Sequence, residues 1–170
     1  MKNKNQFARF INALLMFAAV GLLSACGFAL RGAFDFPFSS IYIGLPETSP
    51  LASELKRNLR ANGKTLIATD PKEADVQLDV LGETRDKAIL SLNSQGRVRE
   101  YNLLYSFRFR VRNKAGIEVL EPTTINLKRN LTYSEAQVLA KENEEALLFR
   151  DMQADLVQQM LRRLAVLKVQ

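Results

Sequence analysis

Residues 101–112 read YNLLYSFRFRVR, an alternation of apolar and polar side chains that decides the fold. Every second position from residue 101 is apolar or aromatic, while Arg108, Arg110 and Arg112 share the other parity. The six apolar or aromatic residues are Tyr101, Leu103, Tyr105, Phe107, Phe109 and Val111. A period of two places successive side chains on opposite faces of a strand. The stretch therefore predicts a strand with one buried face, where each fully buried large side chain contributes about 1.5 to 3 kcal/mol.

The three arginines on the other face have two interpretations. Guanidinium groups bind phosphates bidentately, so the face is a candidate anion site. A solvated cationic face that discourages edge pairing accounts for the same residues without any ligand. We favour the solvated face.

Turn sequences on both sides of this strand predict an antiparallel meander. Residues 93–96 (NSQG) and 113–116 (NKAG) have the composition of hairpin turns. The preceding strand alternates from residue 76 and is expected to continue through residue 92, and the following strand covers residues 117–131.

Two residues predict irregularities in these strands. Gly82 interrupts the alternation of the first one and indicates a bend. Pro122 lacks a backbone N–H, which is typical of an edge strand or a bulge. A shorter strand is predicted at residues 41–45 and an extended run at residues 65–69.

The first helix is predicted to begin after Ser49, whose hydroxyl can cap an early amide, with Pro50 at the first helical position. One face carries a leucine at every fourth residue, and Gly63 supplies a left-handed stop. The leucines are Leu51, Leu55 and Leu59.

A second, longer helix occupies the C-terminal part. It begins either at Ser134, with Gln137 in the reciprocal capping position, or after a break before Lys141. A continuous stripe at helical spacing is expected to face the core. Its members are Phe149, Met152, Leu156, Met160, Leu161, Leu164 and Leu167.

The N-terminus has the three parts of a secretory signal peptide, predicted at residues 1–25. Lys2, Lys4 and Arg9 precede the apolar residues 13–23, which are too few for the roughly 20 needed to span a bilayer. The run Leu23-Ser24-Ala25-Cys26 then resembles the bacterial lipobox.

In that motif the cysteine is acylated and becomes the first mature residue, so Cys26 is the predicted lipid-attachment site and the membrane is reached through the lipid anchor. The alternative is that Cys26 is a small buried apolar residue. Gly27, where an aspartate would favour the inner membrane, resembles the outer-membrane class. The expected location is the cell outer membrane, lipid-anchored on its periplasmic side.

The predicted mature chain consists of a lipidated tether at residues 26–40 and a single α+β domain at residues 41–170. Phe34, Phe36 and Phe38 lie in the tether. This aromatic segment either docks the lipidated end against a partner or bilayer, or covers one end of the core.

Composition excludes several functions. The net charge is +6, but three of the 24 basic residues precede Cys26, so 21 basic and 18 acidic residues remain, an excess too small for a nucleic-acid-binding surface. The chain has no histidine and one cysteine, which excludes Ser-His-Asp and Cys-His catalysis and histidine-ligated metals. No catalytic residue, cofactor or metal site is therefore predicted.

Several segments taken together resemble the LPS-assembly lipoprotein LptE family. They are the lipobox running into residues 26–32 (CGFALRG), Glu100-Tyr101, residues 139–144 (LAKENE) and residues 158–164 (QQMLRRL). The resemblance covers essentially the whole chain and implies an α+β two-layer sandwich, with about four strands in a mixed sheet and two helices packed on one face.

The resemblance also implies a non-enzymatic function. Family members sit within the LptD outer-membrane β-barrel as a plug, assist its assembly and bind lipopolysaccharide for insertion into the outer leaflet. The family's lysine in Leu-Ala-Lys matches Lys141, which is an expected lipopolysaccharide contact. A basic residue that some members carry in the hairpin turn is replaced by Ser94, and Arg97 lies close by as the second candidate.

Two other functions remain open from the sequence. A carboxylate-dependent cell-wall hydrolase needs only two Asp or Glu residues, although no stretch singles out such a pair. The other is a pilot or assembly lipoprotein for a different outer-membrane barrel or secretin.

Overall fold

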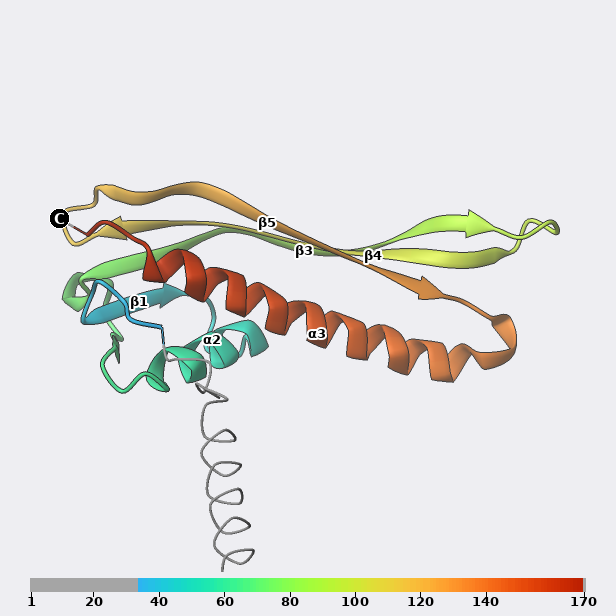
Figure 1. The fold of residues 1–170 in the computed structure, drawn as a ribbon, viewed down its shortest axis with the longest axis horizontal. Helices are drawn as coiled ribbons and strands as arrows, with labels where there is room; N and C mark the ends of the chain where they lie inside the picture. The colour runs from blue at the N-terminus through green and yellow to red at the C-terminus, as the bar shows by residue number, and fades with distance from the viewer. Residues whose placement is uncertain (1–33, 170) are drawn as a thin grey trace, which may run out of the picture. The chain divides into compact units, whose positions relative to one another are not determined.

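The computed structural model describes residues 34–169, which fold into a mixed five-stranded sheet with two helices packed on one face (Figure 1). The strand order is β2-β1-β3-β4-β5. The strands are β1 (Ser40–Gly44), β2 (Leu66–Ile67), β3 (Val76–Leu92), β4 (Val98–Asn113) and β5 (Glu118–Thr132). The helices are α2 (Pro50–Arg60) and α3 (Val138–Ala165), with short 3-10 turns η1 (Pro71–Glu73) and η2 (Glu135–Gln137).

The predicted α+β class with two helices on one sheet face is confirmed. The sheet has one strand more than the expected four, because the extended run after the first helix forms β2 and pairs in parallel with β1. β1 is also parallel to β3, whereas β3, β4 and β5 form the predicted antiparallel meander. The predicted signal peptide, Cys26 and Gly27 lie outside the described residues.

The core is built on the helix-facing side of β4, as the alternation predicts. Leu103, Tyr105, Phe107, Phe109 and Val111 are all buried. They pack against the leucines of α2 and the C-terminal half of α3 in one hydrophobic cluster. The central strand of the meander therefore provides the apolar surface against which both helices pack.

A β-bulge in β3 confirms the bend predicted near Gly82. Val80 pairs with Phe109 and Gly82 pairs with Arg108, so β3 contains one extra residue at this point. An extra residue exchanges the two faces of the strand beyond it. Before the bulge the helix-facing residues of β3 are apolar, and after it they include Arg85.

The outer strand β5 also contains an extra residue, where Phe109 pairs with Thr123 but Val111 pairs with Leu120. Pro122 lies in this irregular stretch of an edge strand, as predicted. Its missing N–H costs no ladder hydrogen bond there.

Helix α2 has the predicted boundaries. Ser49 Oγ accepts a hydrogen bond from the Ala52 amide at 3.3 Å, and Pro50 is the first helical residue. The three predicted leucines are fully buried. Gly63, at φ +69°, follows the helix end.

Helix α3 begins at Val138, after η2, and Ser134 makes no side-chain capping hydrogen bond. Its buried side chains all lie between Met152 and Leu164. In the first half of the helix, residues 138–151, no side chain is fully buried. Apolar burial therefore attaches the second half of α3 to the sheet, whereas the first half has no fully buried side chain.

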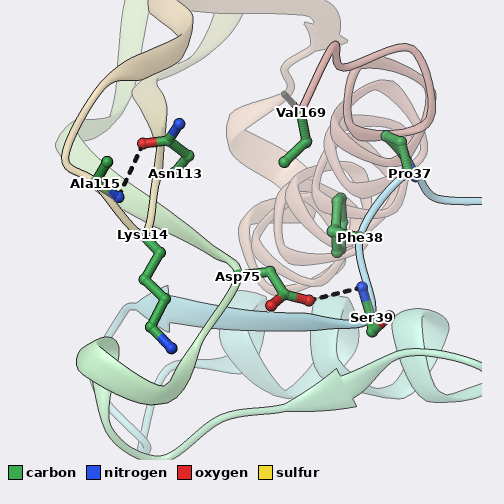
Figure 2. A pocket seen from close by; sticks show the side chains of 8 residues that line it. All are labelled: Pro37, Phe38, Ser39, Asp75, Asn113, Lys114, Ala115 and Val169. Carbon is green, nitrogen blue, oxygen red and sulfur yellow. Dashed lines mark hydrogen bonds between the residues drawn. The ribbon is translucent and has the colours of Figure 1, made fainter.

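The aromatic segment before β1 covers one end of the core. Phe38 is 7% exposed, and its ring stacks on Phe36 with centroids 5.4 Å apart. Asp75 Oδ2 accepts hydrogen bonds from the Ser39 and Ser40 amides, both at 2.9 Å. Figure 2 shows this segment beside a hollow of about 380 Å³ that the β4–β5 turn and the C-terminal tail also line.

Candidate functional site

Beyond the bulge, β3 places charged side chains between the sheet and α3. Arg85 Nη2 donates hydrogen bonds to Tyr105 Oη and Gln153 Oε1, each at 3.0 Å, and to Glu83 Oε1 at 3.2 Å. Gln153 Nε2 donates in turn to Glu54 Oε2 of α2 at 2.7 Å. This polar bridge joins both helices to the sheet.

Tyr105 is part of the same bridge. Its hydroxyl donates a hydrogen bond to Glu83 Oε1 at 2.8 Å. Burial, together with the negative charge of Glu83, raises the pKa of Tyr105. The phenol therefore stays protonated and serves as a donor across the physiological pH range.

Lys87 lies two residues further along the same face of β3. Its ammonium is 4.3 Å from the ring centroid of Tyr101 and 5.8 Å from that of Tyr133, and it pairs with Glu145 of α3. The two rings meet edge to face, with centroids 5.2 Å apart. Cations over aromatic faces are attracted by the ring quadrupole, so Lys87 is fixed on both sides.

Arg97, one of the two predicted lipopolysaccharide contacts, lies just after the β3–β4 turn. Its guanidinium Nη1 is 2.9 Å from Glu135 Oε2 of η2, and both side chains are more than half exposed. Arg97 also lines a hollow of about 310 Å³ together with Arg99 and Tyr133. A negatively charged group can reach this guanidinium from solvent.

Lys141, the other predicted contact, lies in the first half of α3. Its ammonium is 2.8 Å from Glu144 Oε2, and its side chain is 16% exposed. It recurs with Glu145 and Phe149 at helical spacing, which places it on the sheet-facing side of the helix. Lys141 is therefore less accessible than its position on an exposed half-helix suggests.

Arg97 and Lys141 lie at the same end of the fold, where the β3–β4 hairpin and the start of α3 are found (Figure 1). Among the described residues no hydrogen bond or ion pair links these two side chains directly. Instead, each pairs with its own glutamate. We call Lys87, Arg97 and Lys141, with their partners Glu145, Glu135 and Glu144, the distal ion-pair cluster.

Sequence reasoning missed Lys87 and all three glutamates. The spacing of Lys141 and Glu144 by three residues was a readable signal for a helical ion pair. No sequence pattern indicated the ion pair of Lys87, because the orientation of Lys87 toward α3 depends on the bulge upstream in β3.

The arginine face of β4 is largely neutralised by neighbouring strands. Arg110 Nε and Arg112 Nε are 3.0 and 2.6 Å from Asp79 Oδ2, and Arg110 Nη1 is 2.7 Å from Glu118 Oε1. Hydrogen bonding from Arg112, and secondarily from Arg110, lowers the pKa of Asp79. Arg108 is exposed and forms no ion pair with any residue the structure describes.

Within residues 34–169, no three side chains of the metal-binding types come together. None of the helices in that range is both long enough and apolar enough to cross a membrane. The chemistry that the described residues offer is that of charged and aromatic groups on open surfaces. By fold and site, the described residues form an α+β sheet-and-helix domain with charged and aromatic groups on its surface.

Comparison with known proteins agrees with this class. The family model described as "LptE: Lipopolysaccharide-assembly" matches residues 38–164. The LPS-assembly lipoprotein LptE of Yersinia enterocolitica is 27% identical over 157 residues, covering 90% of this chain and 74% of the relative.

Two solved structures share the fold. Lipoprotein B from Nitrosomonas europaea is 35% identical with a TM-score of 0.71, over 82% of this chain and 90% of that one. A minor lipoprotein from Acinetobacter baumannii is 28% identical with a TM-score of 0.62, over 77% and 93%. The chain belongs to the LptE family of non-enzymatic lipopolysaccharide-assembly lipoproteins.

Proposed function

We propose that this protein is an outer-membrane lipoprotein, anchored through Cys26 on the periplasmic side, that plugs an LptD-type β-barrel and assists its assembly. It binds lipopolysaccharide for insertion into the outer leaflet, with Arg97 and Lys141 as contacts to the anionic part of the lipid. The family match over residues 38–164 is the observation that carries the proposal.

The distal ion-pair cluster supports the lipopolysaccharide part. Lipid A carries phosphates, and arginine and lysine bind phosphate through charge-assisted hydrogen bonds. Exposed aliphatic side chains accompany these cations, as an amphiphilic ligand requires. They are Ile89, Leu90 and Leu92 at the end of β3 and Val138, Leu139 and Leu147 in the first half of α3.

The open sheet supports the barrel part. Both helices cover one face, and no other element of residues 34–169 covers the opposite face of β3, β4 and β5, where a partner can pack (Figure 1). Two of its arginines, Arg110 and Arg112, are paired with carboxylates of the neighbouring strands, which lowers the cost of desolvating them against another protein surface.

The test is to recover the full-length lipoprotein from its native outer membrane in mild detergent and to identify the stoichiometric partner by mass. We expect an LptD-type barrel. Recovery of a different barrel or a secretin would favour the alternative function, that of a pilot or assembly lipoprotein for that partner. The absence of any partner would overturn the proposed barrel role.

A further inference from the structure

Three cations of the distal ion-pair cluster are each held by a carboxylate from one short segment, residues 135–145. The pairs Lys87–Glu145, Arg97–Glu135 and Lys141–Glu144 come from separate contacts. An anionic ligand reaching any of these cations must therefore compete with a glutamate already in place.

In the pair between Lys87 and Glu145 both side chains are partly enclosed, whereas in the pair between Lys141 and Glu144 the lysine is 16% exposed and the glutamate 46%. The Lys87 and Glu145 side chains are 32% and 24% exposed, whereas those of the Arg97 pair are 63% and 59% exposed. Solvent screens an enclosed pair less, so its rearrangement has the larger effect on affinity.

Lys87 also has the surroundings that an amphiphile needs. Its ammonium lies over Tyr101, and Ile89, which shares its face of β3, is 59% exposed. A cation with an aromatic ring beneath it and an aliphatic side chain beside it matches a phosphorylated headgroup followed by an acyl chain. Inorganic phosphate would use the cation alone.

We propose that Lys87 is a further contact for the phosphate groups of the lipid, and that the Glu145 carboxylate stays paired with the Lys87 ammonium until the lipid binds. Binding then proceeds by exchange: the phosphate takes the place of the Glu145 carboxylate at the Lys87 ammonium. This inference rests on the proposed lipopolysaccharide-binding function.

The experiment measures binding of purified, fluorescently labelled lipopolysaccharide in detergent micelles to the full-length lipidated protein at fixed ionic strength. The central variant is Glu145→Gln, which removes the competing charge. Its control is Glu142→Gln on the same helix, because Glu142 is exposed and forms no ion pair with any of residues 34–169. Both variants change the net charge equally.

We expect Glu145→Gln to tighten binding about two- to fivefold more than Glu142→Gln, the range measured for partly exposed ion pairs. Lys87→Gln should weaken binding. In a Lys87→Gln background, Glu145→Gln should give no gain beyond that of Glu142→Gln, since the group it releases is gone. Glu144→Gln, which frees Lys141, serves as a second variant should Glu145→Gln fold poorly, and we expect it also to tighten binding.

Equal gains from Glu145→Gln and Glu142→Gln, or a gain that persists without Lys87, would overturn the exchange while leaving lipid binding intact. No binding by the wild-type protein would instead overturn the proposed function, and the exchange with it. If inorganic phosphate displaces the labelled lipopolysaccharide from the protein at a matched phosphate concentration, the site binds free phosphate. That result would contradict the proposal that its ligand is an amphiphilic lipid.

Discussion

Arg85 of β3 donates a hydrogen bond to Gln153 of α3 across 3.0 Å, although the two residues are 68 positions apart in the chain. Gln153 is buried, and its side-chain amide donates a second hydrogen bond to Glu54 of α2. The contact ties α3 to the sheet at a polar position within the buried stripe of the helix.

Replacing Gln153 with alanine is expected to destabilise the fold by about 1 to 3 kcal/mol, because this buried side chain forms hydrogen bonds with the charged groups of Arg85 and Glu54, and both bonds are lost. Urea unfolding followed by circular dichroism measures the change. Gln159→Ala on the same helix is the control, since Gln159 is half-buried and makes no side-chain hydrogen bond with the residues described. Equal losses from both variants would contradict the role of the bridge.

Gly44 is expected to be required for the pairing of β1 with β3. A Cβ atom at this position would lie 2.9 Å from the carbonyl oxygen of Leu78, which is backbone and cannot move aside. Gly44→Ala should cost about 1 to 3 kcal/mol of unfolding free energy, as overpacking does. Gly82→Ala is the matched control, because its Cβ would meet no atom within 4 Å. A stable Gly44→Ala protein would show that the two strands can separate without loss.

The stability contributed by Asp79 is expected to depend on pH. Its two arginine partners hold its pKa below the usual 3.8 in the folded state. A depressed carboxyl pKa stabilises the fold above the unfolded-state value, and this contribution is lost as the pH falls through the folded-state value. Wild type should therefore exceed Asp79→Asn in stability at pH 7, and the difference should shrink below about pH 3.8. A difference that does not change with pH would rule out the charge as its cause.

Charge reversal at the two predicted contacts should weaken lipopolysaccharide binding. Lys141→Glu and Arg97→Glu each replace a cation with a repelling carboxylate beside an existing glutamate, and we expect a loss of about tenfold or more. Lys114→Glu is the control, because Lys114 is exposed in the β4–β5 turn, at the other end of the antiparallel strands. Unchanged binding by Lys141→Glu would exclude Lys141 as a lipid contact.

Cys26→Ser should abolish lipid attachment and release the protein from the membrane fraction, since the hydroxyl cannot take the place of the thiol in the thioether-linked anchor. Fractionation of cells grown with a radiolabelled fatty acid tests this directly. Ser24→Ala changes a neighbouring residue and should leave the label in place. Continued labelling of Cys26→Ser would disprove the predicted attachment site.

The sequence alone determined most of the secondary structure and the class of fold. Alternation along β4, the turn residues on either side of it and the leucine spacing of α2 are local patterns, and each was found where it was predicted. The predicted start of α3 was wrong: the helix begins at Val138, between the two expected positions, and neither Ser134 nor Gln137 caps it through a side chain.

Only the tertiary structure decided which charged residues meet. One extra residue in β3 turns Lys87 toward α3, and the strand's own sequence does not specify the pairing register that makes it extra. The distal ion-pair cluster then depends on contacts between residues as far apart as Lys87 and Glu145, separated by 58 positions. Periodicity predicts which face of an element is apolar, because side-chain direction repeats regularly along each strand or helix and the buried face must be apolar. The choice of ionic partners depends on how those elements are brought together.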